Sequence, residues 1–76
     1  MTGEQFDVHW KALPFRPFIM RMSDGRSFTV RHQDFLYRPP KRRIIYVYEE
    51  EDNGHVLDLR LMTEIEVLDS DELEAA

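Results

Sequence analysis

Residues 18–30 read FIMRMSDGRSFTV and carry the clearest structural signal in the chain. Apolar and polar residues alternate on both sides of a central turn, which is typical of a β-hairpin with one buried face. A loop of three residues, 23–25, with Gly25 at positive φ pairs Met20 with Phe28. A loop of two residues would instead pair apolar side chains with polar ones. The segment therefore predicts a hairpin closed by a three-residue loop.

A short amphipathic helix is expected before this hairpin. Thr2 and Gln5 have the spacing of a capping box, in which each side chain accepts a hydrogen bond from the other residue's backbone. Pro14 ends the helix, because the residue before a proline avoids helical dihedral angles. Phe15 lies in the extended connector that follows and is expected to contact the core. The apolar stripe that we expect to pack on the sheet has helical spacing and consists of Phe6, His9, Trp10 and Leu13.

Three further strands are expected after the hairpin. Residues 32–37 break the alternation, and residues 33–36 within them predict one helical turn or an irregular crossing. Residues 44–48 read IIYVY, a β-branched and aromatic run that is apolar on both faces, as in a central strand. Residues 57–61 and residues 64–67 alternate again and predict two more half-buried strands.

The whole chain is expected to form one small domain. Its 76 residues are too few for a second domain, and a hydrophobic fraction of 42% is too high for disorder. We expect the folded domain to span residues 1–68 and the acidic residues 69–76 to form a flexible tail. The predicted fold class is mainly β: a small bent five-stranded antiparallel sheet or a Sm-like barrel, with one N-terminal helix. The pattern is compatible with either a closed barrel or an open sheet.

Two resemblances accompany this pattern. Residues 20–28, MRMSDGRSF, resemble the first conserved stretch of Sm-like proteins, where an apolar strand runs into an Asp-Gly turn and a basic residue. The remainder lacks that family's bending glycine, its Asp-x-x-x-Asn and its Arg-Gly pair, so the resemblance implies the fold and not the RNA-binding site. Over most of its length the chain is also similar to a family of small uncharacterised bacterial proteins, through PFRPF at 14–18 and DGRSF at 24–28. That similarity implies no activity.

Charge is unevenly distributed along the chain, whose net charge is −5. From Lys11 to Arg43 there are nine basic residues and two acids, whereas from Ile44 to Ala76 only Arg60 opposes eleven acids. Such asymmetry fits a polyanion-binding face followed by an acidic tail. It also fits adjacent strands of opposite charge that pair across a sheet, and this second interpretation is favoured.

The candidate binding residues belong to two groups. A dense basic segment, residues 38–43, is followed by a strand whose second apolar face needs a cover from the helix or from a partner. We therefore expect a small binding module that contacts a protein partner or a second copy of itself. The alternative is nucleic-acid binding through this segment and the strand arginines at 16, 21, 26 and 31, because guanidinium groups bind phosphate and aromatic rings stack on bases. The possible partner-binding residues are Arg38, Lys41, Arg42, Arg43, Tyr46 and Tyr48.

The sequence predicts no enzyme, cofactor or metal site. It contains no cysteine, and its histidines, His9, His32 and His55, lack the spacing of metal ligands. Asp34, two residues after His32, fits a turn cap as well as an acid–base pair. The chain has no secretory leader and no apolar run of about 18 residues, so we expect a cytoplasmic protein that does not enter a membrane.

Overall fold

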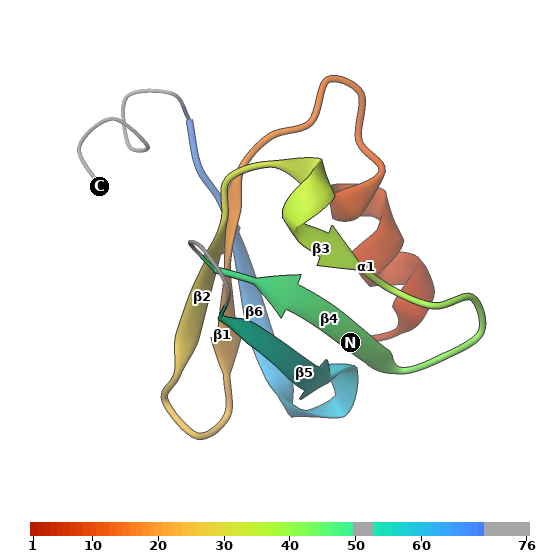
Figure 1. The fold of residues 1–76 in the computed structure, drawn as a ribbon, viewed down its shortest axis with the longest axis vertical. Coiled ribbons are helices and arrows are strands. Elements are labelled where there is room, and N and C mark those ends of the chain that lie inside the picture. The colour runs from red at the N-terminus through yellow and green to blue at the C-terminus, as the bar shows by residue number, and fades with distance from the viewer. Residues whose placement is uncertain (50–52, 70–76) are drawn as a thin grey trace.

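The computed structural model describes residues 1–49 and 53–69 and is mainly β with one helix, as expected (Figure 1). One antiparallel sheet has the strand order β2-β1-β6 and the other has the order β3-β4-β5. The helix is α1 (Gly3–Trp10), and the strands are β1 (Phe18–Met22), β2 (Ser27–Val30), β3 (Leu36–Tyr37), β4 (Ile44–Tyr48), β5 (Gly54–Asp58) and β6 (Met62–Val67).

The number of sheets differs from the expectation. Six strands form two three-stranded sheets where one five-stranded sheet was expected, and the described strands do not close into a barrel. The additional strand is β3, which pairs with β4 directly after the 3-10 turn η1 (Gln33–Phe35). This turn was predicted, but the two-residue strand after it is too short to produce a pattern of its own.

The first hairpin has the predicted register. Met20 lies opposite Phe28, and Gly25 has a φ of 93°, in the left-handed region that glycine adopts without strain. The amide of Gly25 donates to the carbonyl of Met22 across 3.0 Å, and the amide of Met22 donates to the carbonyl of Arg26 across 2.8 Å. These bonds close the loop of three residues.

The helix is shorter than predicted. Thr2 and Gln5 form the expected capping box, and Phe6 is fully buried with its ring 6.1 Å from that of Phe18. However, α1 ends at Trp10, and Leu13 is 91% exposed, so the prediction that Leu13 packs on the sheet was wrong. Because the helix stops at Trp10, the last position of the apolar stripe never reaches the helical face.

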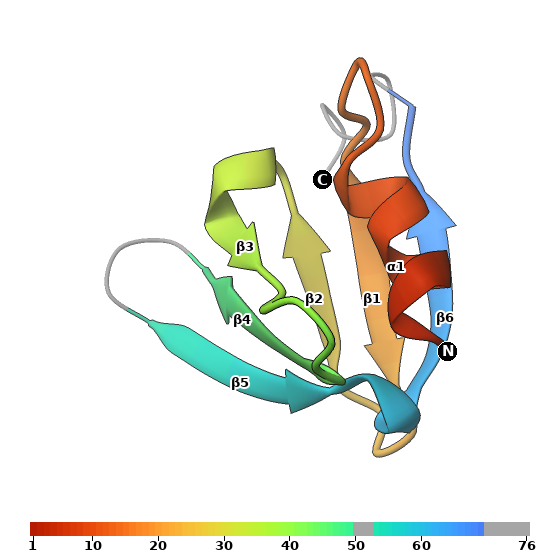
Figure 2. The same cartoon turned by 90° about the vertical axis from the view of Figure 1, so that its right-hand side faces the viewer.

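The strand predicted over residues 57–61 lies earlier in the chain, and only Leu57 and Asp58 of the predicted residues belong to it. Strand β5 ends at Asp58, whose carboxylate accepts a hydrogen bond from the amide of Arg60 across 2.8 Å and caps the 3-10 turn η2 (Leu59–Leu61). Within this turn Leu59 is fully buried, whereas Leu61 is 53% exposed. The turn leads the chain from the second sheet back to β6 of the first sheet (Figure 2).

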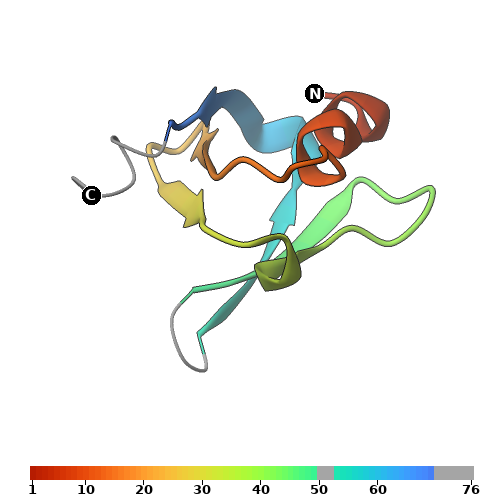
Figure 3. The same ribbon diagram turned by 90° about the horizontal axis from the view of Figure 1, so that it is seen from above.

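The core lies among the two sheets and α1, and it draws residues from almost every element. Helix α1 lies beside β1 and β6 in Figure 2, and seen from above it is on the same side of the molecule as the loop after β3 (Figure 3). Phe15 contacts the core, as expected. The buried cluster contains Phe6, Phe18, Met20, Met22, Phe28, Val30, Leu36, Ile45, Val47, Leu57, Leu59 and Met62.

The predicted boundaries are only partly covered by the structure. Of the expected tail, residues 69–76, only Asp69 belongs to the described residues. No described helix is long and apolar enough to cross a membrane.

Candidate functional site

The basic segment lines a cavity of about 730 Å³ beside the start of α1, here called the basic cavity. Its walls come from the first residues of the chain, the loop between β3 and β4, and the turn η2. Four of the predicted binding residues are brought together here, and Arg60 joins them from a distant part of the sequence. The lining residues are Met1, Thr2, Gly3, Glu4, Arg38, Lys41, Arg42, Arg43 and Arg60.

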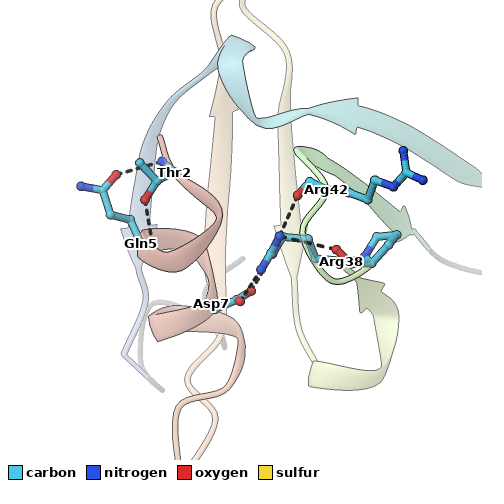
Figure 4. Close-up of polar contacts among 6 residues, drawn as sticks. Thr2, Gln5, Asp7, Arg38 and Arg42 are labelled. Atoms are coloured by element: carbon cyan, nitrogen blue, oxygen red, sulfur yellow. Dashed lines mark hydrogen bonds and ion pairs between the residues drawn. The ribbon is translucent and has the colours of Figure 1, made fainter.

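Arg38 connects the two walls of this cavity. Its side chain is only 10% exposed, and its guanidinium binds the carboxylate of Asp7 on α1 through two hydrogen bonds of 2.8 and 2.5 Å (Figure 4). The remaining nitrogen, Nη1, donates to the carbonyl oxygen of Arg42 across 2.6 Å. The hydrogen bond from Arg38 lowers the pKa of the Asp7 carboxyl. Arg38 therefore ties the helix to the loop and is already satisfied by the protein.

Gly3 allows this close approach. A Cβ atom at Gly3 would lie 2.7 Å from Nη1 of Arg38 and 2.9 Å from its Cζ, both well inside van der Waals contact. Because the guanidinium is held by Asp7 and by a backbone carbonyl, it has little freedom to move away. Glycine at the first position of α1 therefore leaves room for the guanidinium of Arg38.

The three remaining cations of the segment are differently placed. Lys41, Arg42 and Arg43 are exposed, and within residues 1–49 and 53–69 none of them forms an ion pair. In contrast, Arg60 pairs with Asp58 across 2.7 Å, and its side-chain hydrogen bond lowers the pKa of that carboxyl to about 2. Within the described residues, the basic cavity therefore holds three cations without a salt-bridge partner, and of these Arg43 is near enough to Asp58 to help lower the pKa of that carboxyl.

The loop that carries these cations is strained at Lys41. This residue has a φ of 62°, and the amide of Arg42 donates to the carbonyl of Pro39 across 3.3 Å. In a turn of this kind the residue with positive φ is normally glycine or asparagine. A lysine costs about 1 kcal/mol or more in this conformation.

Two of the strand arginines form local ion pairs instead of extending the basic surface. Arg21 on β1 pairs with Glu64 and Glu66 of β6 across 2.9 and 2.6 Å, which confirms the cross-strand interpretation for this residue. Arg26 pairs with Asp24 of its own turn across 2.7 Å. These two arginines therefore do not support the predicted phosphate-binding groove. The basic cavity remains the main cationic feature that fits this prediction.

The predicted tyrosines lie on a different surface. Tyr37 is opposite Tyr46, and Tyr46 is opposite Val56, so the three form a row across β3, β4 and β5 on the face away from the core. They are 51%, 36% and 62% exposed, respectively. Helix α1 reaches only the edge of this row, where the ring of Trp10 lies 5.9 Å from that of Tyr37. The second face of β4 is therefore not covered by the helix.

Tyr48 extends this surface along β4. It is 50% exposed and lies opposite Gly54, where a Cβ atom would be only 2.9 Å from Cε1 of Tyr48, so the ring lies over the glycine backbone. The half-buried Ile44 is at the other end of the strand. The aromatic face is defined here as Tyr37, Ile44, Tyr46, Tyr48 and Val56.

The other predicted groups do not converge. His9, His32 and His55 each lie against a different aromatic ring, at centroid distances of 6.4, 5.2 and 4.8 Å. Among the described residues no group of three or more His, Asp or Glu side chains is placed to hold a metal ion. A second cavity of about 490 Å³ lies beside β2, and Arg31, Tyr48 and Glu49 are among its described lining residues.

Sequence reasoning missed several residues of both surfaces. Arg60 and Gly3 reach the basic cavity only because α1 and η2 are folded against the loop, and no local pattern records that. Val56 could have been found, because it alternates with His55 and Leu57 in a β-branched context. The strand was predicted to begin at Leu57, one residue after Val56, so Val56 was not considered.

No protein-family model matches the chain, and no significant match is found among curated proteins or among solved structures. The basic cavity and the aromatic face are therefore the features that point to a function.

Proposed function

We propose that this chain is a small cytoplasmic binding module that associates with a second copy of itself through the aromatic face. The observation that carries the proposal is the uncovered row of Tyr37, Tyr46 and Val56 across three adjacent strands. Contiguous apolar side chains on the surface of a small domain usually mark an interface. Tyrosine is also one of the residues most enriched in interfaces, because its ring is large and loses little entropy on binding.

The charges that flank β4 favour a second copy as the partner. Lys41, Arg42 and Arg43 directly precede the strand, and Glu49, the first of four consecutive acids in the sequence, directly follows it. A two-fold axis that lies in the plane of the interface and is perpendicular to β4 brings the two aromatic faces together and sets β4 antiparallel to the β4 of the other copy. The basic end of each strand then meets the acidic end of the other, so the same surface is complementary to itself in charge.

The size of the face indicates a weak dimer. With about 200 Å² for a whole tyrosine side chain, Tyr37, Tyr46, Tyr48 and Val56 expose on the order of 350–400 Å² per copy. Two copies would bury about 750 Å² of this surface, and the flanking charged side chains raise the total toward the roughly 1,000 Å² that a specific interface needs. We expect a dissociation constant between about 10 μM and 1 mM.

Sedimentation velocity over a concentration series tests this proposal. The wild type should change from monomer to dimer between about 10 μM and 1 mM, and Tyr46→Lys should remain monomeric because it places a charge in the centre of the interface. The matched control is Val8→Lys, which changes an apolar residue that is 68% exposed on α1, away from the aromatic face. A wild type that stays monomeric, or a dimer that Tyr46→Lys leaves intact, contradicts the proposal.

Nucleic-acid binding through residues 38–43 is the second candidate function, and the basic cavity is the observation that favours it. The candidate is weakened because Arg38 binds Asp7, and because Tyr46 and Tyr48 are not among the residues that line the cavity. A fluorescence titration with a single-stranded oligonucleotide tests it. Three available cations predict a log–log salt slope of about −2, from about −0.7 for each phosphate that is neutralised.

For the fold, we propose an opened relative of the Sm-like arrangement. One helix precedes a hairpin with an Asp-Gly turn, β1 lies between β2 and the last strand, and a 3-10 turn leads into that last strand. This order of elements supports the proposal.

A further inference from the structure

We propose that the basic cavity is a binding site for a phosphate group, with Lys41, Arg42 and Arg43 as its cationic ligands. The phosphate is carried by a small molecule or by the end of a nucleic-acid chain, and both sources share the chemistry that the cavity recognises. The aromatic face contributes no residue to the lining of this cavity, although the proposed dimer sets the same three cations beside the acidic end of the other copy's β4.

The balance of charge in the cavity is the first argument. Asp7 and Asp58 pair with Arg38 and Arg60, whereas Glu4 is the only acid among the described residues that line the cavity beside the other three cations. Cations gathered at one site repel each other and create a positive potential that attracts an anion. A phosphate dianion would balance this excess. Arginine is particularly suited to the task, because its planar guanidinium binds two phosphate oxygens at once.

The backbone of Lys41 is the second argument. Its φ of 62° is unfavourable for a residue with a side chain, and glycine would adopt it without cost. Strained residues of this kind are concentrated at binding sites, where a particular side chain is needed in spite of the cost. Here the strained residue is also one of the three unpaired cations of the cavity.

The start of α1 adds further donors to the same cavity. The hydroxyl of Thr2 accepts the amide hydrogen of Gln5, and the amide of Phe6 already bonds to the carbonyl of Thr2. The amides of Gly3 and Glu4 therefore remain as first-turn donors without an acceptor within the helix, and both residues line the cavity. The positive end of the helix dipole adds to the field of the three cations.

Arg38 prepares the site without contacting the ligand. It binds the carboxylate of Asp7 on α1 and the carbonyl oxygen of Arg42 in the loop, with a side chain that is nine-tenths buried. The backbone of the loop that carries the cations is thereby held against the helix before a ligand arrives. Such preorganisation reduces the entropy that binding would otherwise cost.

The lining also limits the class of ligand. A volume of about 730 Å³ is larger than one phosphate ion and lies within the range of small-molecule sites. No aromatic residue lines the cavity, so it offers no ring on which a nucleobase could stack. A compact phosphorylated molecule or a terminal phosphate fits this lining better than a nucleobase does.

Calorimetric titration with inorganic pyrophosphate at low salt is the direct test. We expect one-to-one binding to the wild type, and a loss of affinity of about tenfold or more in the double variant Arg42→Gln, Arg43→Gln. The matched control is Arg16→Gln, Arg31→Gln, which removes the same charge from two arginines outside the basic cavity and should change the affinity less than about twofold. Circular dichroism of each variant shows whether the fold is retained.

A third variant separates ligand binding from loop structure. Lys41→Gly should raise the thermal stability, because the strain disappears, and should lower the affinity for pyrophosphate, because a cation is lost. A purely structural role for Lys41 predicts the higher stability with unchanged affinity. That result would overturn the assignment of Lys41.

The source of the phosphate is decided by two further titrations. Binding of glycerol phosphate as tightly as pyrophosphate supports a small-molecule ligand, and tighter binding of a 5′-phosphorylated oligonucleotide than of its 5′-hydroxyl twin supports a chain end. Equal binding of the two oligonucleotides without any binding of pyrophosphate means a diffuse polyanion surface and overturns the proposal. Absence of all binding at low salt overturns it as well. Neither result affects the sedimentation test of the aromatic face.

Discussion

At the scale of single residues, Gly25 isolates the effect of backbone conformation from that of packing. Its φ is 93°, and no atom lies within 4 Å of the place where a Cβ would be. We expect Gly25→Val to lower the free energy of unfolding by about 1–2 kcal/mol, the usual cost of left-handed geometry for a residue with a side chain. Urea denaturation measures it. The control is Ser27→Val, at an exposed position of β2, which should change stability by less than about 0.5 kcal/mol. Equal effects of the two substitutions would show that the loop does not depend on glycine.

Arg38 illustrates what a sequence conceals at the same scale. It was predicted to bind a partner because it belongs to a dense basic segment, whereas its guanidinium is occupied by Asp7, which is 31 positions away. The conformation of Gly25 could be predicted because it depends on neighbours within the hairpin. The role of Arg38 could not be predicted, because it depends on where the fold places a distant carboxylate.

At the scale of elements, the Asp7–Arg38 pair ties α1 to the second sheet, together with two hydrogen bonds between Trp10 and Gln33. Asp7→Asn should lower the free energy of unfolding by about 1.5–3 kcal/mol, because it weakens two hydrogen bonds to a charged and mostly buried guanidinium. Urea denaturation at neutral pH measures the difference. The control is Asp34→Asn, an exposed carboxylate in η1 that should cost little.

The same pair has a defined dependence on pH. The pKa of Asp7 is lower in the folded chain than its unfolded value of about 3.9. Its contribution to stability is therefore fully present above about pH 4 and is lost as the pH falls through the folded pKa. The difference between the wild type and Asp7→Asn should shrink below about pH 4. A difference that persists unchanged to about pH 2 would indicate that the carboxylate charge is not its cause.

The element boundaries show where sequence patterns lose information. The capping box and the hairpin register were predicted because both follow from spacing within a few residues. The alternation of Leu57, Leu59 and Leu61 was interpreted as a strand. However, Leu59 and Leu61 belong to a 3-10 turn that Asp58 caps, and of these two only Leu59 is buried. A period of two over three leucines is too short to distinguish these conformations. Strand β3, with two residues, carries still less signal.

At the scale of the whole molecule, the arrangement of sheets decides which candidate residues act together. The basic segment and the tyrosines of β4 are adjacent in sequence, and both were predicted to bind a partner. In the fold, Arg38, Lys41, Arg42 and Arg43 face a cavity beside α1, whereas Tyr46 belongs to the outer face of the second sheet. The basic residues and the tyrosines could each be identified from the sequence. That they lie on different surfaces could not be predicted, because it follows from the path of the loop and from the packing of α1.

The electrostatic potential of the whole chain, whose net charge is −5, reaches the basic cavity over longer distances than direct contacts do. Asp71, Glu72 and Glu74 lie outside the described residues, yet their charges contribute to the field of the molecule. Ending the chain at Asp69 removes these three acids and changes the net charge from −5 to −2. The repulsion of an approaching anion should fall accordingly, while the lining of the basic cavity is unchanged.

We therefore expect the shortened chain to bind pyrophosphate about two- to fivefold more tightly than the full chain at low salt. The difference should disappear near physiological ionic strength, because the Debye length falls from about 30 Å at 0.01 M salt to about 8 Å at 0.15 M. Calorimetry at both salt concentrations measures it. The full-length variant Asp71→Asn, Glu72→Gln, Glu74→Gln has the same net charge as the shortened chain and should bind equally tightly. If the shortened chain gains affinity and the variant with the three substituted acids does not, the effect of removing residues 70–76 is not electrostatic.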